Sequence, residues 1–348
     1  MKGSENMANL TNHERPGIYS GYEMASVLQS GSGGKAVAIA TLVSGADAGL
    51  AGEVVTLHKA EGFSSESVMG QMVALALANG AYCVYAYGVK DAGGYAAAYE
   101  ALLGCDNVGV LVSDASGESG LQLVREAVVA ASNDRRECVG VCGVCGAVSE
   151  QIALAQAVNS ERMVLVGTTA AAGEGLFAAA VGGAVAALGD VSVPLGGVEL
   201  NGALPECGVF SDNEIDALVR GGVTAVESRR GVVEVVRAVT SRSKSGNGSD
   251  STWRELTTVL IVDNVVSGLR ESLKARFHRA RNTEQTRGAI RSQVILELEN
   301  KKSREMIAGY QAVSVQAMEE NPTVCLVTFA FSVSHGLNQI WISAHISV

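Results

Sequence analysis

Three cysteines are the sharpest candidates for chemistry in this sequence. Cys138, Cys142 and Cys145 are separated by three and then two residues, a spacing at which three thiolates can hold a [4Fe–4S] cluster. The intervening residues are only Val and Gly, which indicates a buried strand rather than the open loop that a cluster needs. In such a strand Cys138 and Cys142 face one side and Cys145 the other. We favour thiols packed as small apolar side chains, with an iron–sulfur enzyme as an alternative.

A nucleophilic thiol or serine is a second possibility, and it would need a neighbouring base. Histidine is scarce, since the chain has only five. None of them lies in the central part of the chain, where apolar runs alternate with helical patterns. The five are His13, His58, His278, His335 and His345.

Phosphate-binding loops are incomplete in this sequence. Residues 32–36 lack the upstream Gly and the Ser or Thr of a P-loop, and Gly173-Glu174-Gly175 carries a carboxylate where a phosphate would sit. We therefore predict no catalytic residue, no cofactor and no metal site. A soluble α/β enzyme that uses a nucleotide or a reactive thiol remains the alternative.

The composition limits the partners and the compartment. The chain of 348 residues has 26 basic and 36 acidic residues and a net charge of −10, which argues against a nucleic-acid partner. Its seven cysteines lie mostly in apolar runs, as reduced thiols do. Residues 163–188 carry one charge, but Ala and Gly dominate and glycines interrupt the segment. A buried strand, loop and helix explain this segment better than a membrane span, so we predict no membrane insertion.

An alternation of strands and helices dominates the middle of the chain. Strands that are apolar throughout, each followed by an amphipathic helix, predict a parallel sheet covered on both faces. We also expect a helix that begins at Ser64 or Ser65 and ends at Ala78, and a helix from Ser211 to Arg220. The expected strands are 36–42, 53–58, 81–87, 108–112, 139–144, 163–166, 223–226 and 232–239, and the other helices are 118–132, 147–158 and 174–188.

The last hundred residues have a different pattern. Residues 241–251 read SRSKSGNGSDS, which predicts a flexible, solvated linker. A helix over 256–277 follows, with its apolar face predicted at Val262, Val266, Leu269, Leu273 and Phe277. A second helix over 284–300 has Ile290, Val294 and Leu298 on one face. Strands are expected at 312–317 and 323–333, and the strict alternation of 340–348 predicts a further strand that must pair with something.

Charge is distributed unevenly along the chain. Residues 268–305 hold ten basic and five acidic residues, so this stretch has a net charge of +5 and the remainder −15. An ordinary solvated helix face would explain the pattern. A basic surface that docks on an acidic partner would explain it equally well.

The order of several motifs resembles the contractile tail sheath proteins of phages and of phage-tail-like particles. The motifs are Arg15-Pro16-Gly17-Ile18-Tyr19, an Ala/Gly-rich helix at 178–188 followed by PLGGVELNG at 194–202, Ser211-Asp212-Asn213-Glu214, and Gly221-Gly222-Val223-Thr224. A helix pair and strands then follow, with Phe277, Asn282 and Arg287 between the helices or at their start. The resemblance covers nearly the whole chain and rests on this order rather than on one signature.

The resemblance implies a structural protein rather than an enzyme. Sheath proteins form stacked hexameric rings around an inner tube, and the sheath contracts to drive the tube through a cell envelope. The implied partners are other copies of the chain, the inner tube protein, and baseplate and tail terminator proteins. The implied location is a virion or phage-tail-like particle, assembled in the cytoplasm of a bacterial host.

The implied fold is α/β (α+β overall), with a central βα sheet domain covered by helices, a C-terminal domain of two helices and antiparallel strands, and extended arms. We expect an arm at 1–16, a strand-rich part at 17–90, an α/β domain at 91–240 that resembles subtilisin in fold only, a linker at 241–252, a C-terminal domain at 253–339 and an arm at 340–348. The expected inter-subunit arm residues are Arg15, Pro16, Ile18, Tyr19, Ile340, Ile342, Ile346 and Val348. The expected tube-facing basic residues are Arg270, Lys274, Arg276, Arg279 and Arg281.

Overall fold

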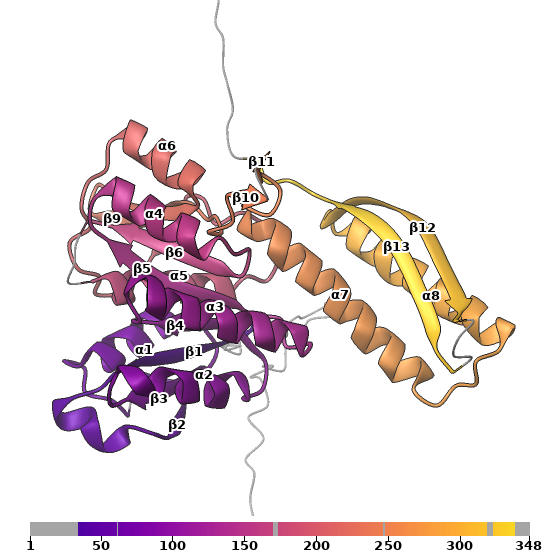
Figure 1. The fold of residues 1–348 in the computed structure, drawn as a ribbon, viewed down its shortest axis with the longest axis horizontal. Helices are drawn as coiled ribbons and strands as arrows, with labels where there is room; N and C mark the ends of the chain where they lie inside the picture. Colours follow the sequence, from indigo (N-terminus) through magenta and orange to yellow (C-terminus); the bar gives the residue numbers. More distant parts are fainter. Residues whose placement is uncertain (1–33, 61, 170–172, 246–247, 319–322, 338–348) are drawn as a thin grey trace, which may run out of the picture. The chain divides into compact units, whose positions relative to one another are not determined.

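A computed structural model describes residues 34–60, 62–169, 173–245, 248–318 and 323–337 (Figure 1). An α/β sheet domain comes first along the chain, and a long helix then leads into a helix pair with a β-hairpin. The arms predicted at 1–16 and 340–348 lie outside the described residues.

The α/β domain is built on one mixed sheet of nine strands. Their order is β2-β3-β1-β4-β5-β6-β8-β9-β7. The six strands from β3 to β8 in this order are parallel, whereas β2, β9 and β7 are antiparallel to their neighbours. The bounds are β1 Ala36–Leu42, β2 Val54–Leu57, β3 Val84–Val89, β4 Val108–Ser113, β5 Val139–Cys145, β6 Met163–Thr168, β7 Glu199–Leu200, β8 Val223–Arg229 and β9 Val232–Arg237. The predicted α/β fold is confirmed.

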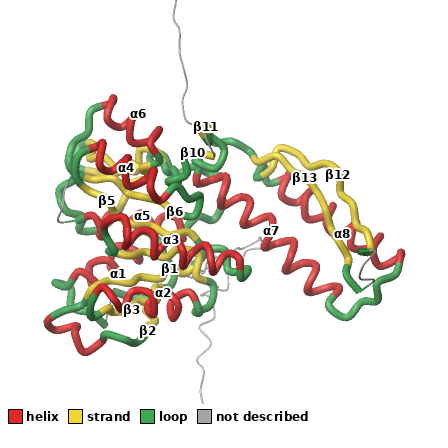
Figure 2. The backbone as a smooth tube through the Cα atoms, viewed as in Figure 1, coloured by secondary structure: helices red, strands yellow, loops and turns green. Residues whose placement is uncertain are grey.

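Helices cover both faces of this sheet (Figure 2). One face carries α1 and α5, and the other carries α2, α3, α4 and α6. Short 3-10 turns at Gly45–Leu50 and Ala92–Gly94 link other elements. The helix bounds are α1 Val68–Ala78, α2 Tyr95–Leu103, α3 Gly117–Asn133, α4 Val148–Val158, α5 Glu174–Ala186 and α6 Asp212–Gly221.

The membrane-like composition of 163–188 has a simple explanation in the structure. Strand β6 is buried along its whole length, and every residue of α5 after Glu174 is buried. Helix α5 also packs closely on α1, because a Cβ on Gly183 would lie 2.4 Å from the carbonyl oxygen of Ala76. Among the described residues, no helix has the length and hydropathy of a membrane span.

The start of α1 differs from the prediction. The helix begins after Ser67, whose side chain accepts a hydrogen bond from the Gly70 N–H at 3.0 Å. Ser64 instead lies one turn upstream, where its carbonyl accepts from the Ser67 hydroxyl. Several serines precede this helix, so the sequence alone does not select which of them caps it.

The C-terminal part consists of two long helices and a hairpin. Helix α7, Leu256–Phe277, packs on α8, Glu284–Ser303, and both helices contact the antiparallel strands β12, Ile307–Ala317, and β13, Cys325–Val333. The two predicted helices and the strand predicted at 323–333 lie close to these bounds, whereas β12 begins at Ile307, before the predicted start at 312. The shared apolar core contains Ile261, Val265, Leu269, Val294, Leu298 and Ile307.

The buried face of α7 is not the predicted one. The structure buries Ile261, Val265 and Leu269, whereas Val266 is 37% exposed and Val262 only half-buried. Two apolar stripes on this helix share Leu269, so periodicity alone could not choose between them. Which stripe of α7 is buried is decided by the α/β domain and by the C-terminal helix and hairpin, which both pack on this helix.

The segment predicted as a flexible linker makes specific contacts in its described part. Ser241 is fully buried, and Arg242 pairs with Asp250 across the segment. Residues Lys244–Ser245 (β10) and Gly248–Ser249 (β11) pair as a small antiparallel sheet. Small polar residues predict solvation in the sequence, but here their hydrogen bonds are made to other parts of the chain.

Candidate assembly surface

Three ion pairs fix α7 to the α/β domain. Each joins an arginine to a carboxylate across the boundary between the sheet and the helix, and each is mostly screened from solvent, with side-chain exposures between 13% and 33%. Two of the pairs join residues that are 101 and 133 positions apart, and the third joins residues 18 apart, so no local sequence pattern indicates them. The pairs are Arg162–Asp263, Arg237–Glu255 and Arg270–Glu137.

The Arg162–Asp263 pair is the most buried of the three. The guanidinium donates two hydrogen bonds to the carboxylate, of which the bond from Nη2 to Oδ1 measures 2.7 Å. Burial raises the pKa of Asp263 above its ordinary value, although Arg162 opposes this shift. A bidentate pair of this kind fixes orientation as well as distance.

The Arg270–Glu137 pair lies further along the same helix. Arg270 donates to Glu137 at 2.5 Å and 3.2 Å. Burial raises the pKa of Glu137, but the hydrogen bonds from Arg270, a backbone hydrogen bond and the charges of Arg270 and Arg162 together outweigh burial, so the pKa lies below its ordinary value. Arg270, predicted to face an inner tube, therefore already has a carboxylate partner within the chain.

The other predicted basic residues have a different environment. Lys274 and Arg276 lie in the last turns of α7, and Arg279 and Arg281 lie in the connection to α8. All four are exposed. Their role on a tube-facing surface stays a prediction. The arm residues Arg15, Pro16, Ile18, Tyr19, Ile340, Ile342, Ile346 and Val348 lie outside the described residues.

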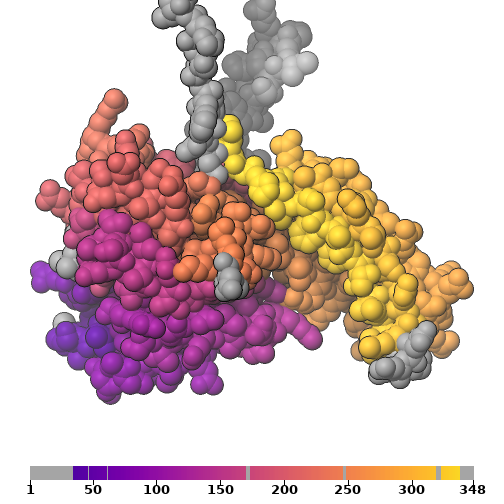
Figure 3. All heavy atoms as spheres, turned by 45° about the horizontal axis from the view of Figure 1, so that its top comes forward, coloured from indigo at the N-terminus to yellow at the C-terminus, as the bar shows by residue number. Residues whose placement is uncertain are grey.

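The β12–β13 hairpin has one covered face and one open face. Val327, Phe329 and Phe331 point toward the helices, whereas Leu326 on the opposite face is 52% exposed. Figure 3 shows the yellow hairpin at the surface of the molecule. The strict alternation in β13 follows from this one-sided packing.

The outer edges of the β12–β13 hairpin have no strand partner among the described residues. Within the described residues, β12 and β13 pair only with each other. A two-stranded sheet exposes a row of backbone N–H and C=O groups on both outer edges, which is a template for further strands.

Strand β12 is irregular near Ala312, which has a φ of 52°. At this point the Arg291 side chain donates a hydrogen bond to the Val313 carbonyl at 3.0 Å.

The cysteine motif is built into the sheet. Cys138 and Cys142 are buried in the same apolar cluster, and burial raises the pKa of each thiol to about 12. Cys145 is half-buried; desolvation and then the neighbouring Glu174 raise its pKa to about 11. All three therefore stay protonated at neutral pH, which does not suit a nucleophile.

The ligand crevice that α/β sheets of this kind use lies beyond the carboxyl ends of β1 and β4, where the strand order reverses. Here that position holds Asp114, which directly follows β4. Its carboxylate accepts hydrogen bonds from the Thr41 hydroxyl, the Leu42 N–H at 3.1 Å and the Tyr95 hydroxyl at 2.5 Å. A carboxylate at this point repels a phosphate, and its hydrogen bonds tie β1 and α2 to β4.

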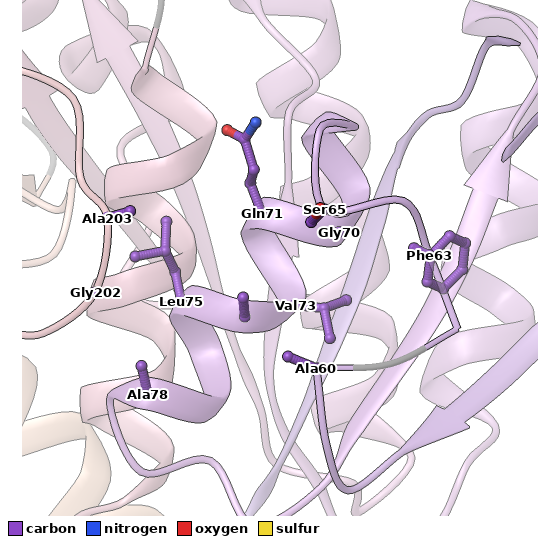
Figure 4. A pocket seen from close by; sticks show the side chains of 11 residues that line it. Ala60, Phe63, Ser65, Gly70, Gln71, Val73, Leu75, Ala78, Gly202 and Ala203 are labelled. Carbon is purple, nitrogen blue, oxygen red and sulfur yellow. The ribbon is translucent and has the colours of Figure 1, made fainter. Parts of the chain in front are cut away.

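A hollow beside α1 offers no groups for acid–base chemistry. It measures about 270 Å³ and lies between α1, the loop that contains Phe63, and residues Gly202 and Ala203 (Figure 4). Gln71 and Ser65 are the polar side chains in its lining. Neither titrates near neutral pH, so we assign no catalysis to this hollow.

Comparisons with known proteins show what this chain is similar to. Residues 248–347, which include α7, α8, β12 and β13, match the family model described as the phage tail sheath C-terminal domain. No curated protein matches the chain.

Solved structures extend the similarity to the other domain. A chain of the anti-feeding prophage helical sheath in its contracted state is 17% identical, with a TM-score of 0.66, 97% of this chain covered and 100% of that one. A chain of the anti-feeding prophage baseplate has the same identity and coverage and a TM-score of 0.69. A sheath tail protein of Desulfitobacterium hafniense is 10% identical, with a TM-score of 0.64, 91% of this chain covered and 100% of that one.

The predicted resemblance to the contractile tail sheath family is confirmed. For residues 248–347 it rests on the family match, and for the rest of the chain it rests on the fold. The open edges of β12 and β13 lie in the part of the chain that carries the family match.

The Arg162–Asp263 pair can be tested by substitution. Asp263→Asn leaves Arg162 largely buried without its charged partner, and we expect the free energy of unfolding to fall by about 3 kcal/mol. Asp216→Asn is the matched control, because Asp216 pairs with Arg220 on an exposed face of α6. We expect a loss of about 0.5 kcal/mol or less there. Urea unfolding measures both, and equal losses would contradict the assignment.

The Arg270–Glu137 pair predicts a pH dependence. Because the pKa of Glu137 is lowered in the folded chain, its stabilising effect is complete above the unfolded value of about 4.3 and is lost as the pH falls through the lower folded value. Glu137→Gln removes this proton linkage. Between about pH 5 and pH 3, the unfolding free energy of the variant should therefore fall less steeply than that of the parent chain. Urea unfolding at several pH values measures this slope, and identical slopes would argue against the pair.

Proposed function

We propose that the chain is a structural subunit of a contractile tail sheath, not an enzyme. Copies polymerise as stacked hexameric rings around an inner tube, and the assembled sheath shortens to drive the tube through a target cell envelope. The observation that carries the proposal is the β12–β13 hairpin: a two-stranded sheet whose outer edges pair with no other strand of the described residues, in the part of the chain that matches the sheath domain family.

The arms are the proposed partners of these edges. Residues 340–348 alternate between apolar and polar side chains, as a donated strand does when it adds to a sheet with one covered face. Backbone hydrogen bonds would give the contact its strength, and alternate side chains would set its register. Residues 15–19 at the other end are the second proposed arm. Repeated contacts of this type between different surfaces build helical polymers.

Contraction is proposed to move whole subunits rather than to deform them. Helix α7 contributes Leu256 and Val259 to the core of the α/β domain and Ile261 and Val265 to the core of the C-terminal part. Ion pairs add to this shared packing. Relative motion would therefore be concentrated between copies, with the arms as the connections that persist.

The remaining assignments follow from the same proposal. The exposed Lys274, Arg276, Arg279 and Arg281 form the tube-facing surface, where salt-sensitive contacts let the sheath slide. Baseplate and tail terminator proteins bind the two ends of the sheath. The particle is a virion or a phage-tail-like particle and is assembled in the bacterial host cytoplasm.

Removing residues 340–348 tests the donated strand. We expect the truncated chain to fold, because residues 36–333 supply its described apolar cores, but to form no tubes or rings. Negative-stain microscopy of purified protein measures assembly, and circular dichroism with urea unfolding checks the fold. Long tubes from the truncated chain would exclude this arm as the donor.

Charge reversal tests the tube-facing surface. Arg276→Glu, Arg279→Glu and Arg281→Glu together should prevent assembly on the tube while the chain still folds, since all three side chains are exposed. Arg230→Glu, in the exposed turn between β8 and β9, is the control and should assemble normally. Co-expression with the tube protein and electron microscopy give the readout; normal sheathed tubes from the triple variant would refute the assignment.

A further inference from the structure

A groove of about 380 Å³ lies between the end of α5 and the loop that follows it. Its apolar lining comes from Ala184 and Leu188 on one side and from Val193, Leu195 and Val198 on the other. Val193 is 53% exposed although it is apolar. Polar residues also line the groove, namely Asn79, Asp190, Glu199 and Asn201. The Asn79 amide is satisfied by the Leu75 carbonyl and the Asn201 backbone.

The described chain ends at this groove. After β13, the Ser334 N–H donates to the Met306 carbonyl at 3.2 Å. The backbone of Gly336 then lies against Pro194, because a Cβ on this glycine would be 2.7 Å from Pro194 Cγ. The next residue, Leu337, is 75% exposed. Pro194 stands directly between Val193 and Leu195, two of the residues that line the groove.

The residues that follow are the nearest candidates to occupy the groove. From Gly336, an extended chain advances about 3.3–3.6 Å per residue, so Ile340 and Ile342 lie within reach of a surface that starts at Pro194. Both belong to the apolar side of the alternating segment 340–348. A strand with one apolar side that is left in water is an aggregation hazard, which proteins usually cover.

We infer that, before assembly, residues 338–348 dock in the groove of the same chain, with Ile340 and Ile342 against Val193 and Leu188. The inference rests on the proposed function, because it assigns a storage site to the arm that would later be donated to a neighbour. Docking hides the apolar side of the arm from other copies. It therefore delays polymerisation until a growing edge of β12 or β13 competes for the same residues.

The groove variant Val193→Asp tests this storage site. Placing a carboxylate at the mouth of the groove should release the arm without unfolding the chain, since the side chain is half exposed. Val209→Asp is the matched control, because Val209 is 88% exposed and does not line the groove. Hydroxyl-radical footprinting with mass spectrometry, on dilute full-length chain, reports the exposure of Ile340 and Ile342.

The parent chain and the control should show both isoleucines protected relative to a synthetic peptide of residues 338–348. Val193→Asp should raise their labelling to the level of the peptide. If the docked form outnumbers the released form by about tenfold, the variant should also polymerise up to about tenfold faster. Light scattering measures this rate.

Three results would overturn the inference. They are peptide-like labelling in the parent chain, protection that persists in Val193→Asp, and protection that disappears on dilution, which would make a second copy the occupant. Failure of every variant to polymerise would count against the proposed function instead, because footprinting of the dilute chain does not depend on assembly.

Discussion

The structure depends on the way α7 is held. This helix links the nine-stranded sheet domain to the helix pair and hairpin, and its residues belong to two apolar cores. Packing alone would leave the helix free to slide or rotate by small amounts. The arginine–carboxylate pairs with Asp263, Glu255 and the α/β-domain residue Glu137 remove that freedom, because each sets a distance and an orientation. Under the proposed function, a sheet edge that receives strands from other copies has to be held at a fixed angle to the body of its own subunit.

The α/β body has the architecture of many enzymes, but the residues that suggest chemistry in its sequence make structural contacts here. Where such folds usually bind a phosphate, Asp114 accepts hydrogen bonds from β1 and α2. The thiols of the cysteine motif lie inside the sheet, and burial raises their pKa far from neutral. The same residue types that suggest catalysis in the sequence therefore serve here to hold strands and helices together.

Assembly and storage place opposite demands on the chain ends. An arm that adds to a neighbouring sheet must present an apolar side, yet that side must not meet water or the wrong partner before assembly. The groove between α5 and Leu195 lies where the described chain ends, next to Pro194. A weak site of this kind beside the start of the arm would be sufficient, because a contact within one chain competes at a high effective concentration.

The sequence by itself determined the elements and their order. Hydrophobic periodicity placed the parallel strands, α5 and the limits of α7, because these signals are local and follow from a period of two or 3.6 residues. The order of motifs in the sequence also indicated the resemblance to the sheath family. Only the tertiary structure decided which stripe of α7 is buried, that residues 241–245 are anchored, and that Arg270 already has a partner in Glu137. Each of these depends on residues far apart in the chain meeting in space, and a local pattern carries no information about such a meeting.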